Sequence, residues 1–202
     1  MSDGDVGVGG TRGEGGGGSA GPERAPEARE RRPGPDEHAR FYDGYLERVP
    51  DGDIVATLES QLGRFRALLE SVPADRETFA YADGKWTVRE VVGHVVDCER
   101  MLAYRVLHVA RRDPAPLPDM DQEVWADGSN AASRSLRSLA LELEAVRAAT
   151  VELLEGLDDA AWDRRGVASS WEVSVRALAW IAAGHAEHHL RILVERYGLG
   201  AP

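Results

Sequence analysis

Residues 136–157 read LRSLALELEAVRAATVELLEGL. Apolar side chains and one threonine recur here at alternating spacings of three and four residues, at Leu136, Leu139, Leu143, Val146, Thr150, Leu153 and Leu157. A helix places residues at this spacing along one face, and that face can then bury against neighbouring helices. The pattern therefore predicts a helix that forms one seam of a helical bundle.

Three further stretches show the same helical periodicity. The first presents one apolar face, has Asp51 or Asp53 as its N-cap and stops before Pro73; the face consists of Ile54, Leu58, Leu62, Phe65 and Leu69. The second runs from Thr87 to about Arg111 and begins with the spacing of a capping box, Thr87 and Glu90. The third starts near Ser174 and ends by Gly198. No segment shows a competing strand pattern, so we expect an all-α four-helix bundle.

The linkers between these helices are residues 73–86, 112–131 and 157–173. The middle linker contains three prolines, and loops of this length often cover a functional site. It has a second interpretation, in which Met120 and Trp125 plug one end of the core.

The N-terminal segment, residues 1–36, consists mainly of Gly, Pro, Glu and Arg and has almost no large apolar side chain. Such a composition buries too little surface to offset the entropy of ordering the chain. We therefore expect a disordered tail followed by one domain at residues 37–202, a length sufficient for a single core.

Charge and cysteine content exclude several classes of protein. The chain of 202 residues has a net charge of −11, which disfavours binding to nucleic acid or to anionic lipid. Cys98 is the single cysteine, so neither an intrachain disulfide nor a cysteine-rich zinc cluster can form. No stretch has the length or order of a membrane span or a signal peptide, and we expect a cytoplasmic protein. Lys85 is the only lysine in the sequence, beside 23 arginines, and this preference for arginine is typical of GC-rich bacterial genomes.

Four of the six histidines lie in two short segments, GHVVD (93–97) and GHAEHHL (184–190). His185 and His189 are four residues apart, so they share a helical face and can converge on one ion. His94 faces the core edge of its own helix. Buried imidazoles need partners for both nitrogens, and three that meet favour a metal ion; the alternative is a core histidine that a backbone carbonyl satisfies. His188 points about 100 degrees away from His189 and is expected at the rim of the site, where it could support the ligands; the alternative is that it binds the metal in place of His189.

The sequence resembles the DinB/YfiT-like metalloproteins, which are four-helix bundles with a three-histidine metal site. The resemblance rests on two stretches, KWTVREVVGHVVDCERMLAYRVLHVARRDPAPLPDMDQEVW (85–125) and WIAAGHAEHHLRILVERYG (180–198). In that family one histidine comes from the second helix and a His-x-x-x-His pair comes from the last. The resemblance therefore implies His94, His185 and His189 as the metal ligands.

A set of three imidazoles suits zinc, nickel, iron(II) or copper and disfavours calcium and magnesium. Zinc is the first choice for this divalent transition metal. Three protein ligands leave a position open, where a bound water or thiol would lose its proton more easily. Position 186 is alanine, so the His-Glu-x-x-His pattern of metallopeptidases is absent.

Other polar residues near the histidines have two readings each. Glu90 and Asp97 flank His94 on its helical face and could orient its imidazole. Alternatively, Glu90 only caps its helix and Asp97 pairs with Arg100 or Arg89. Cys98, one turn after His94, could reach the metal or could serve as a small buried hydrophobe.

The resemblance implies several activities. Members of the family include transferases that add low-molecular-weight thiols such as bacillithiol or mycothiol to electrophiles, thiol-dependent isomerases, and metal-dependent hydrolases. We expect a thiol S-transferase that acts on a small-molecule electrophile, because no protein nucleophile or base suited to hydrolysis is evident. The alternatives are a metal-dependent hydrolase and a non-enzymatic, stress-related bundle that binds metal or dimerises. Family members often form homodimers, which we expect here as well.

Overall fold

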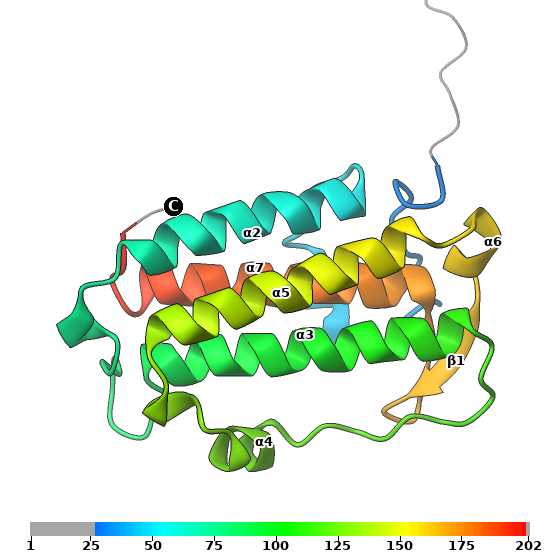
Figure 1. The fold of residues 1–202 in the computed structure, drawn as a ribbon. Coiled ribbons are helices and arrows are strands. Elements are labelled where there is room, and N and C mark those ends of the chain that lie inside the picture. Colours follow the sequence, from blue (N-terminus) through cyan, green and yellow to red (C-terminus); the bar gives the residue numbers. More distant parts are fainter. Residues whose placement is uncertain (1–26, 201–202) are drawn as a thin grey trace, which may run out of the picture.

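The computed structural model describes residues 27–200. Its four long helices form a bundle, as predicted, and they are α2 (Ile54–Glu70), α3 (Val88–Ala110), α5 (Leu136–Glu155) and α7 (Val175–Glu195) (Figure 1). Among the described residues, no helix combines the length and apolar character needed to cross a membrane.

Side-chain caps fix where each long helix begins. Asp53 accepts hydrogen bonds from the Val55 and Ala56 amides at the start of α2. Thr87 and Glu90 form the predicted capping box at the start of α3. Ser135 and Ser174 cap α5 and α7 in the same way. Each cap satisfies amide groups that have no partner within the helix, so the sequence sets the helix starts closely.

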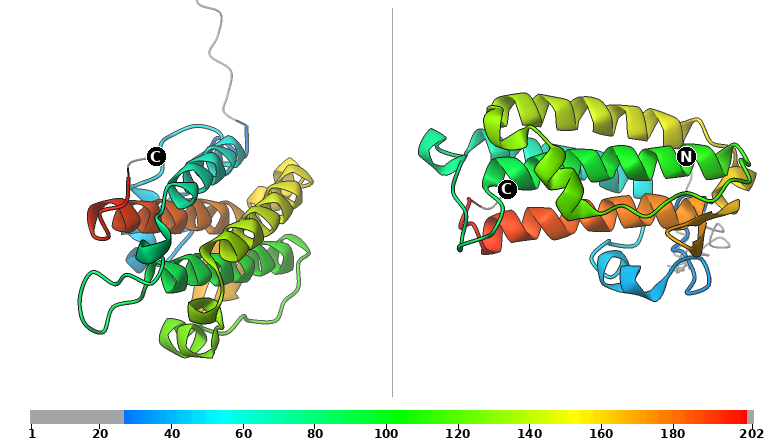
Figure 2. Two further views of the ribbon diagram at one scale, coloured as in Figure 1. Left: turned by 60° about the vertical axis from the view of Figure 1, so that its left-hand side comes forward. Right: turned by 90° about the horizontal axis from the view of Figure 1, so that it is seen from below.

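The direction of the helices, which the sequence left open, follows from the views of the bundle (Figures 1 and 2). α2 and α7 run one way, and α3 and α5 run the other. α3 packs against α5 and α7, and α2 packs against the same two helices. The antiparallel pairing of α3 with α7 brings the first half of α3 beside the second half of α7, which places the two histidine segments at one level.

The predicted seam of α5 is buried at Leu136, Leu139, Leu143 and Thr150, but only partly buried at Val146 and Leu153. The buried residues of this helix are Leu136, Leu139, Leu143, Arg147, Thr150 and Leu154. The heptad pattern places Val146 and Leu153 in the core instead. A straight helix has 3.6 residues per turn and drifts by about 20 degrees per heptad, so the buried face moves on by one residue.

The helical bundle also contains a short hairpin, which the sequence patterns did not indicate. Strands β1 (Arg165–Ala168) and β2 (Trp171–Ser174) form an antiparallel hairpin before α7. Ser169 and Ser170 make its turn with φ values of +52° and +67°, a backbone region usually taken by Gly or Asn. The strands are short and do not alternate in burial, and their turn has neither Gly nor Asn. Neither periodicity nor turn residues therefore predicted this hairpin.

Shorter elements connect the bundle: η1 (Arg40–Tyr42), α1 (Asp43–Leu46), η2 (Ala74–Arg76), α4 (Gln122–Gly128), η3 (Ala131–Ser133) and α6 (Asp159–Trp162). The middle linker, with α4, runs back along α3 and does not plug an end of the bundle (Figure 1). Met120 lines a cavity there, while Trp125 is 43% exposed.

Part of the predicted tail packs on the bundle. Residues 1–26 lie outside the described residues, but residues 27–36 are described and make specific contacts. The guanidinium of Arg32 lies 4.4 Å from the ring of Trp180 and donates to the carbonyl oxygens of Leu46 and Val49. Arg29 pairs with Asp53 at 2.9 Å. Composition therefore placed the start of the domain too late, because arginine stems pack and their head groups bind carbonyls and carboxylates.

The apolar core consists of two clusters, one toward each end of the bundle. Leu102, Leu178 and Ile181 belong to the first cluster, and Val91, Val95 and Leu190 belong to the second. Buried polar residues lie at the junction, among them the Glu99–Arg147 ion pair and the histidines. The bundle therefore has a polar layer near its middle.

Candidate metal centre

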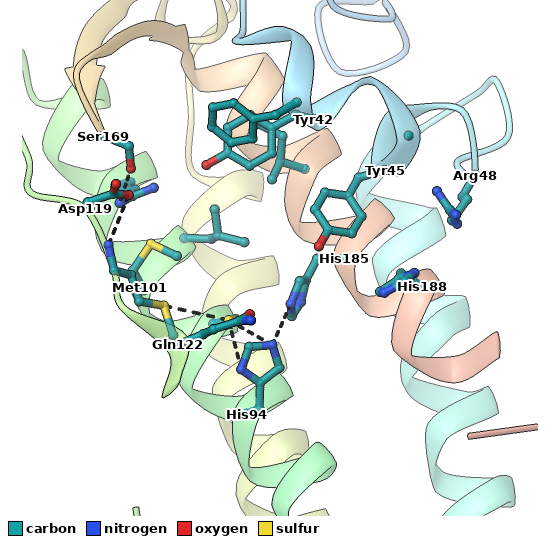
Figure 3. Close-up of a pocket in the computed structure, with 17 residues that line it drawn as sticks. Tyr42, Tyr45, Arg48, His94, Met101, Asp119, Gln122, Ser169, His185 and His188 are labelled. Carbon is teal, nitrogen blue, oxygen red and sulfur yellow. Dashed lines mark hydrogen bonds between the residues drawn. The ribbon is translucent and has the colours of Figure 1, made fainter. Parts of the chain in front are cut away.

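The structure brings together the three histidines that the sequence singled out. His94 comes from the first half of α3, and His185 and His189 come from the second half of α7. All three side chains are buried. The ring centroids lie 5.1 Å apart for His94 and His185, 4.8 Å for His94 and His189, and 4.5 Å for His185 and His189. Figure 3 shows His94 and His185 facing each other across the α3–α7 interface.

The hydrogen bonding of the three rings is incomplete. The Nε2 atoms of His94 and His185 lie 3.1 Å apart, so at most one proton lies between two nitrogens. Nδ1 of His189 is buried and has no hydrogen-bond partner among residues 27–200. Buried polar atoms without partners are costly and call for an explanation such as an ion or a water molecule. Converging ring nitrogens fit a transition metal, whereas magnesium and calcium would require oxygen donors.

Burial keeps these imidazoles neutral at physiological pH. It lowers the pKa of His185 to about 3 and that of His94 to about 4, and nearby histidines add to the effect. Burial likewise lowers the pKa of His189 well below its usual value. A neutral imidazole is the form that binds a metal, so no proton has to leave first.

Cys98 lies closer to the histidines than its reading as a buried hydrophobe requires. Its sulfur is 3.6 Å from Nε2 and 3.7 Å from Nδ1 of His94, and 3.9 Å from the sulfur of Met120. One donor atom each from His94, Cys98 and His185 fall within 4.8 Å of one another. Burial raises the pKa of the Cys98 thiol to about 12, so the thiol is protonated in the absence of an ion. The structure therefore offers two sets of donors, which share His94 and His185.

The carboxylates proposed to orient His94 are engaged elsewhere. Glu90 accepts hydrogen bonds from the amide and hydroxyl of Thr87. Asp97 lies 3.9 Å from Arg100. In the part of the chain that the structure describes, neither carboxylate is hydrogen-bonded to an imidazole of the cluster. Their alternative readings, as a cap and as an ion-pair partner, match these contacts.

Aromatic rings hold the histidines in place. The centroid of Trp86 lies 4.8 Å from that of His94, and the ring of Tyr45 lies 5.7 Å from His185 and 5.4 Å from His188. The approach of Tyr45 depends on Gly184, because a Cβ atom there would lie 2.3 Å from the Tyr45 carbonyl oxygen. Gly184 directly precedes His185, so the absence of a side chain lets α1 pack against α7 beside the site.

A cavity of about 380 Å³ opens beside the histidines. His94, Cys98, His185 and His188 line one side. His188 is half-buried at the rim, as predicted. The remaining wall includes residues that sequence reasoning missed: Tyr42, Tyr45, Arg48, Arg105, Asp119 and Ser169. These residues come from four separate segments that have no common motif, so only the fold brings them together (Figure 3).

Relatives of known sequence match most of this domain. A protein of Oceanobacillus iheyensis, named a putative metal-dependent hydrolase, is 28% identical over 138 residues, which are 66% of this chain and 77% of that protein. A protein of Geobacillus kaustophilus with the same name is 24% identical over 158 residues, which are 70% of this chain and 89% of that protein.

Solved structures share the fold. YfiT from Bacillus subtilis, described as "a probable metal-dependent hydrolase with an unusual four-helix bundle topology", matches with a TM-score of 0.65 at 18% identity and covers 85% of this chain and 95% of its own. The mycothiol-dependent maleylpyruvate isomerase matches with a TM-score of 0.60 at 14% identity and covers 81% of this chain and 65% of its own. The family model of the DinB superfamily matches residues 57–193, which include all three histidines. Because this match spans more than half of the sequence, the chain belongs to the DinB superfamily.

Proposed function

We propose that this protein is a metal-dependent enzyme in which His94, His185 and His189 hold a divalent transition metal, with zinc as the first choice. We further propose that it transfers a low-molecular-weight thiol to an electrophilic small molecule. The observation that carries this proposal is the convergence of three buried, neutral imidazoles, two of which, those of His94 and His185, line a cavity of about 380 Å³. Three protein ligands leave room for a further ligand, which is typical of catalytic sites.

A bound metal would supply Lewis acidity, which lowers the pKa of a thiol or a water molecule bound beside it. The chain itself fixes the rings and limits the access of water. Trp86 packs against His94, and Tyr45 packs against His185 and His188. His188 lines the same cavity, and burial lowers its pKa, so its neutral imidazole can accept the proton that an incoming thiol gives up.

The polar groups of the cavity favour a thiol over water as the nucleophile. Hydrolysis often employs a carboxylate base placed against the attacking water. Glu187 is adjacent in sequence to the histidines but pairs with Arg64 at 2.6 Å and Arg191 at 3.3 Å. Asp119 is the carboxylate among the residues that line the cavity, and Figure 3 shows it beside Ser169, away from the histidines. A thiol needs less help, because its own acidity is much greater than that of water.

Metal content tests the first step. Protein purified without a histidine tag is compared by elemental analysis with a variant that carries His94→Ala, His185→Ala and His189→Ala. We expect about one equivalent of a transition metal in the wild type and almost none in the variant. Equal metal content in the two proteins, with equal helical signal by circular dichroism, would refute the ligand assignment.

Thiol dependence tests the second step. The zinc-loaded protein is incubated with cysteine, bacillithiol or mycothiol and with monochlorobimane, an electrophile that becomes fluorescent on reaction. We expect a rate above that of the His185→Ala variant for at least one thiol. If no thiol gives such a rate, the transferase proposal fails.

Hydrolysis is the second candidate, because two relatives are named putative metal-dependent hydrolases. It predicts turnover of esters or amides without added thiol. A non-enzymatic bundle predicts neither activity, and its metal would instead stabilise the fold. Chelation separates this case, because removal of a structural metal costs much of the folding free energy.

A further inference from the structure

We propose that the cavity beside the histidines binds the carboxylate of the electrophilic substrate, and that Arg105 is the residue that recognises it. The identity of this carboxylate as part of the substrate rests on the proposed function. Binding of a carboxylate in the cavity does not, and it can be measured on its own.

Arg105 differs from the other buried arginines. Three arginines are buried in the described part of the chain, Arg105, Arg147 and Arg176. Arg147 forms a bidentate pair with Glu99 at 2.8 and 2.9 Å. Arg176 pairs with Glu37 at 2.9 Å and with Asp163 at 2.6 Å. No carboxylate of residues 27–200 lies within ion-pair distance of Arg105.

An unpaired guanidinium is costly to bury. Arginine stays protonated in proteins, and Arg105 is 3% exposed. Its Nη2 donates to the carbonyl oxygen of Pro118 at 2.8 Å and to Oγ of Ser169 at 3.0 Å, which leaves the remaining donors of the planar fork for another partner. Arg105 lines the cavity, so a ligand that enters the cavity can reach it. An anion with two oxygens would supply the missing charge and fit the fork.

Hydroxyl groups surround this end of the cavity. The hairpin turn that holds Ser169 at a φ of +52° directs its side chain to Arg105. Tyr42 is adjacent: burial raises the pKa of its hydroxyl, and Arg105 and Ser169 oppose this rise through charge and hydrogen bonding. Each hydroxyl has one O–H donor, which can add a hydrogen bond to a carboxylate held by the guanidinium.

The charge of the wall also favours an anion. Arg48 lines the cavity near His188 (Figure 3), and its side chain has no ion pair or hydrogen bond with any described residue. Asp119 is the carboxylate of the lining, and its Oδ1 accepts a hydrogen bond from the amide of Met120 at 3.2 Å. With neutral histidines, two arginines outweigh one aspartate, whereas the chain as a whole has a net charge of −11. A positive cavity in an acidic protein concentrates small anions at that place.

The spacing of Arg105 from the histidines suits a small acid. Arg105 follows His94 by eleven residues on α3, which corresponds to about 16 Å along the helix axis. Side chains on a helix lean toward its N-terminus, so Arg105 leans toward the level of His94. The cavity of about 380 Å³ then spans a carboxylate at one end and a reacting carbon near the histidines at the other.

The test measures binding of butanoate, with butanamide as the uncharged analogue of the same shape. NMR titration is carried out on the full chain as purified and again after removal of metal, so that a carboxylate bound to a metal is distinguished from one bound to arginine. We expect butanoate but not butanamide to bind in both states. Equal binding of the two compounds, or no butanoate binding at millimolar concentration, would overturn the proposal.

Variants locate the site. Arg105→Met should weaken butanoate binding by about tenfold or more, because hydrogen bonds to a charged group are lost, and Arg105→Lys should restore part of it. Arg111→Met removes an exposed arginine at the end of the same helix and should leave binding unchanged. Asp119→Asn should strengthen binding, which keeps the proposal testable if Arg105→Met does not fold. Wild-type affinity in folded Arg105→Met, or no gain in Asp119→Asn, would contradict it.

A carboxylate of the thiol could occupy the same place. The thiol-transfer assay separates the two sources, because each reactant can be supplied with or without a carboxylate. If the electrophile carries the recognised group, Arg105→Met raises KM for the acidic electrophile and leaves KM for the thiol and for a neutral electrophile unchanged. A rise in KM for an acidic thiol only would assign the site to the thiol and overturn the assignment to the electrophile. Absence of any thiol activity would refute the proposed function, while the butanoate titration would still decide whether the cavity binds a carboxylate.

Discussion

The ion pair between Glu99 and Arg147 allows a sharp prediction about the polar layer of the bundle. Both side chains are almost fully buried, at 3% and 1% exposure. Arg147 Nε and Nη2 each donate to one carboxylate oxygen, and Nη1 donates to the carbonyl oxygen of Leu58 at 2.9 Å. The pair therefore joins α3 to α5 and α2. We predict that Arg147→Met is strongly destabilising, because it leaves the carboxylate of Glu99 buried without its partner.

The expected magnitude follows from the desolvation of that carboxylate. Removal of one partner of a buried ion pair costs about 3 to 5 kcal/mol, whereas replacement of both partners by apolar residues is often close to neutral. Domains of this size are stable by roughly 5 to 15 kcal/mol, so the single variant would lose a large part of its stability. The double variant Glu99→Met/Arg147→Met should instead recover most of the loss, which gives a coupling energy of about 2 kcal/mol or more.

Urea unfolding followed by circular dichroism measures all four proteins of this double-mutant cycle. Metal content is determined for each protein, so that a change in metal occupancy is not taken for a change in the pair. If the two single substitutions are additive within about 0.5 kcal/mol, the side chains do not interact in the way the contacts indicate, and the reasoning is wrong.

Three further predictions concern packing, charge and donor identity. Gly184→Ala should destabilise the protein by about 2 kcal/mol or more, because the new methyl group would lie 2.3 Å from a carbonyl oxygen of α1. Gly63 has open space around it, so Gly63→Ala should stabilise α2 by about 0.5 to 1 kcal/mol. Urea unfolding measures both variants, and effects of the same sign would contradict this packing. Arg89 lowers the pKa of Glu77 by hydrogen bonding, so this carboxylate stabilises the fold above its ordinary pKa of 4.5, and the contribution is lost as the pH falls through the lower folded pKa. The loss of stability caused by Glu77→Gln at pH 7 should therefore become smaller below pH 4.5. A loss that does not depend on pH would count against the ion pair. Cys98→Ser should retain its metal, and the cobalt-substituted wild type should show no thiolate-to-cobalt charge-transfer band, because three buried histidines supply the ligands without the thiol. A band that disappears in Cys98→Ser would make the thiol a ligand.

The sequence predicted where the helices start better than which of their faces are buried. Asp53, Thr87, Ser135 and Ser174 are caps whose local chemistry is complete within four residues, so the helix starts follow from short stretches. The hairpin before α7 was missed because its strands are short and its turn consists of two serines. Periodicity and turn signals act locally, and this hairpin carries neither.

The three histidines were predictable because their spacing on two helices already has chemical meaning, but the opposite wall of the cavity was not. Tyr42, Arg105 and Ser169 lie at the end of η1, late in α3 and in a hairpin turn. Each is unremarkable within its own segment. Only the return of the hairpin to the end of α3 and the packing of α1 on α7 give them a common cavity.

The polar layer shows why hydrophobic patterns fail near the candidate metal centre. On α2 the pattern selects Leu62, but the structure buries Gln61; on α5 it selects Val146, but the structure buries Arg147. In both helices the buried polar residue is a direct neighbour of the apolar residue that the pattern selects. Gln61 uses this position to donate to the carbonyl oxygen of Ala183, two residues before His185, at 2.9 Å.

A purely apolar layer would remove that bond and the ion pair at once. Nonpolar contacts have little directional preference, so helices packed through them alone can shift along one another at low cost, whereas the bonds of Gln61 and Arg147 each fix one relative position of the helices. The guanidinium of Arg147 binds both the carboxylate of Glu99 and a backbone carbonyl of α2, so this one side chain joins three helices. We therefore expect the double variant Glu99→Met/Arg147→Met to fold but to bind metal more weakly than the wild type. Unchanged metal affinity in that stable variant would show that the ion pair is not needed to align His94 with His185.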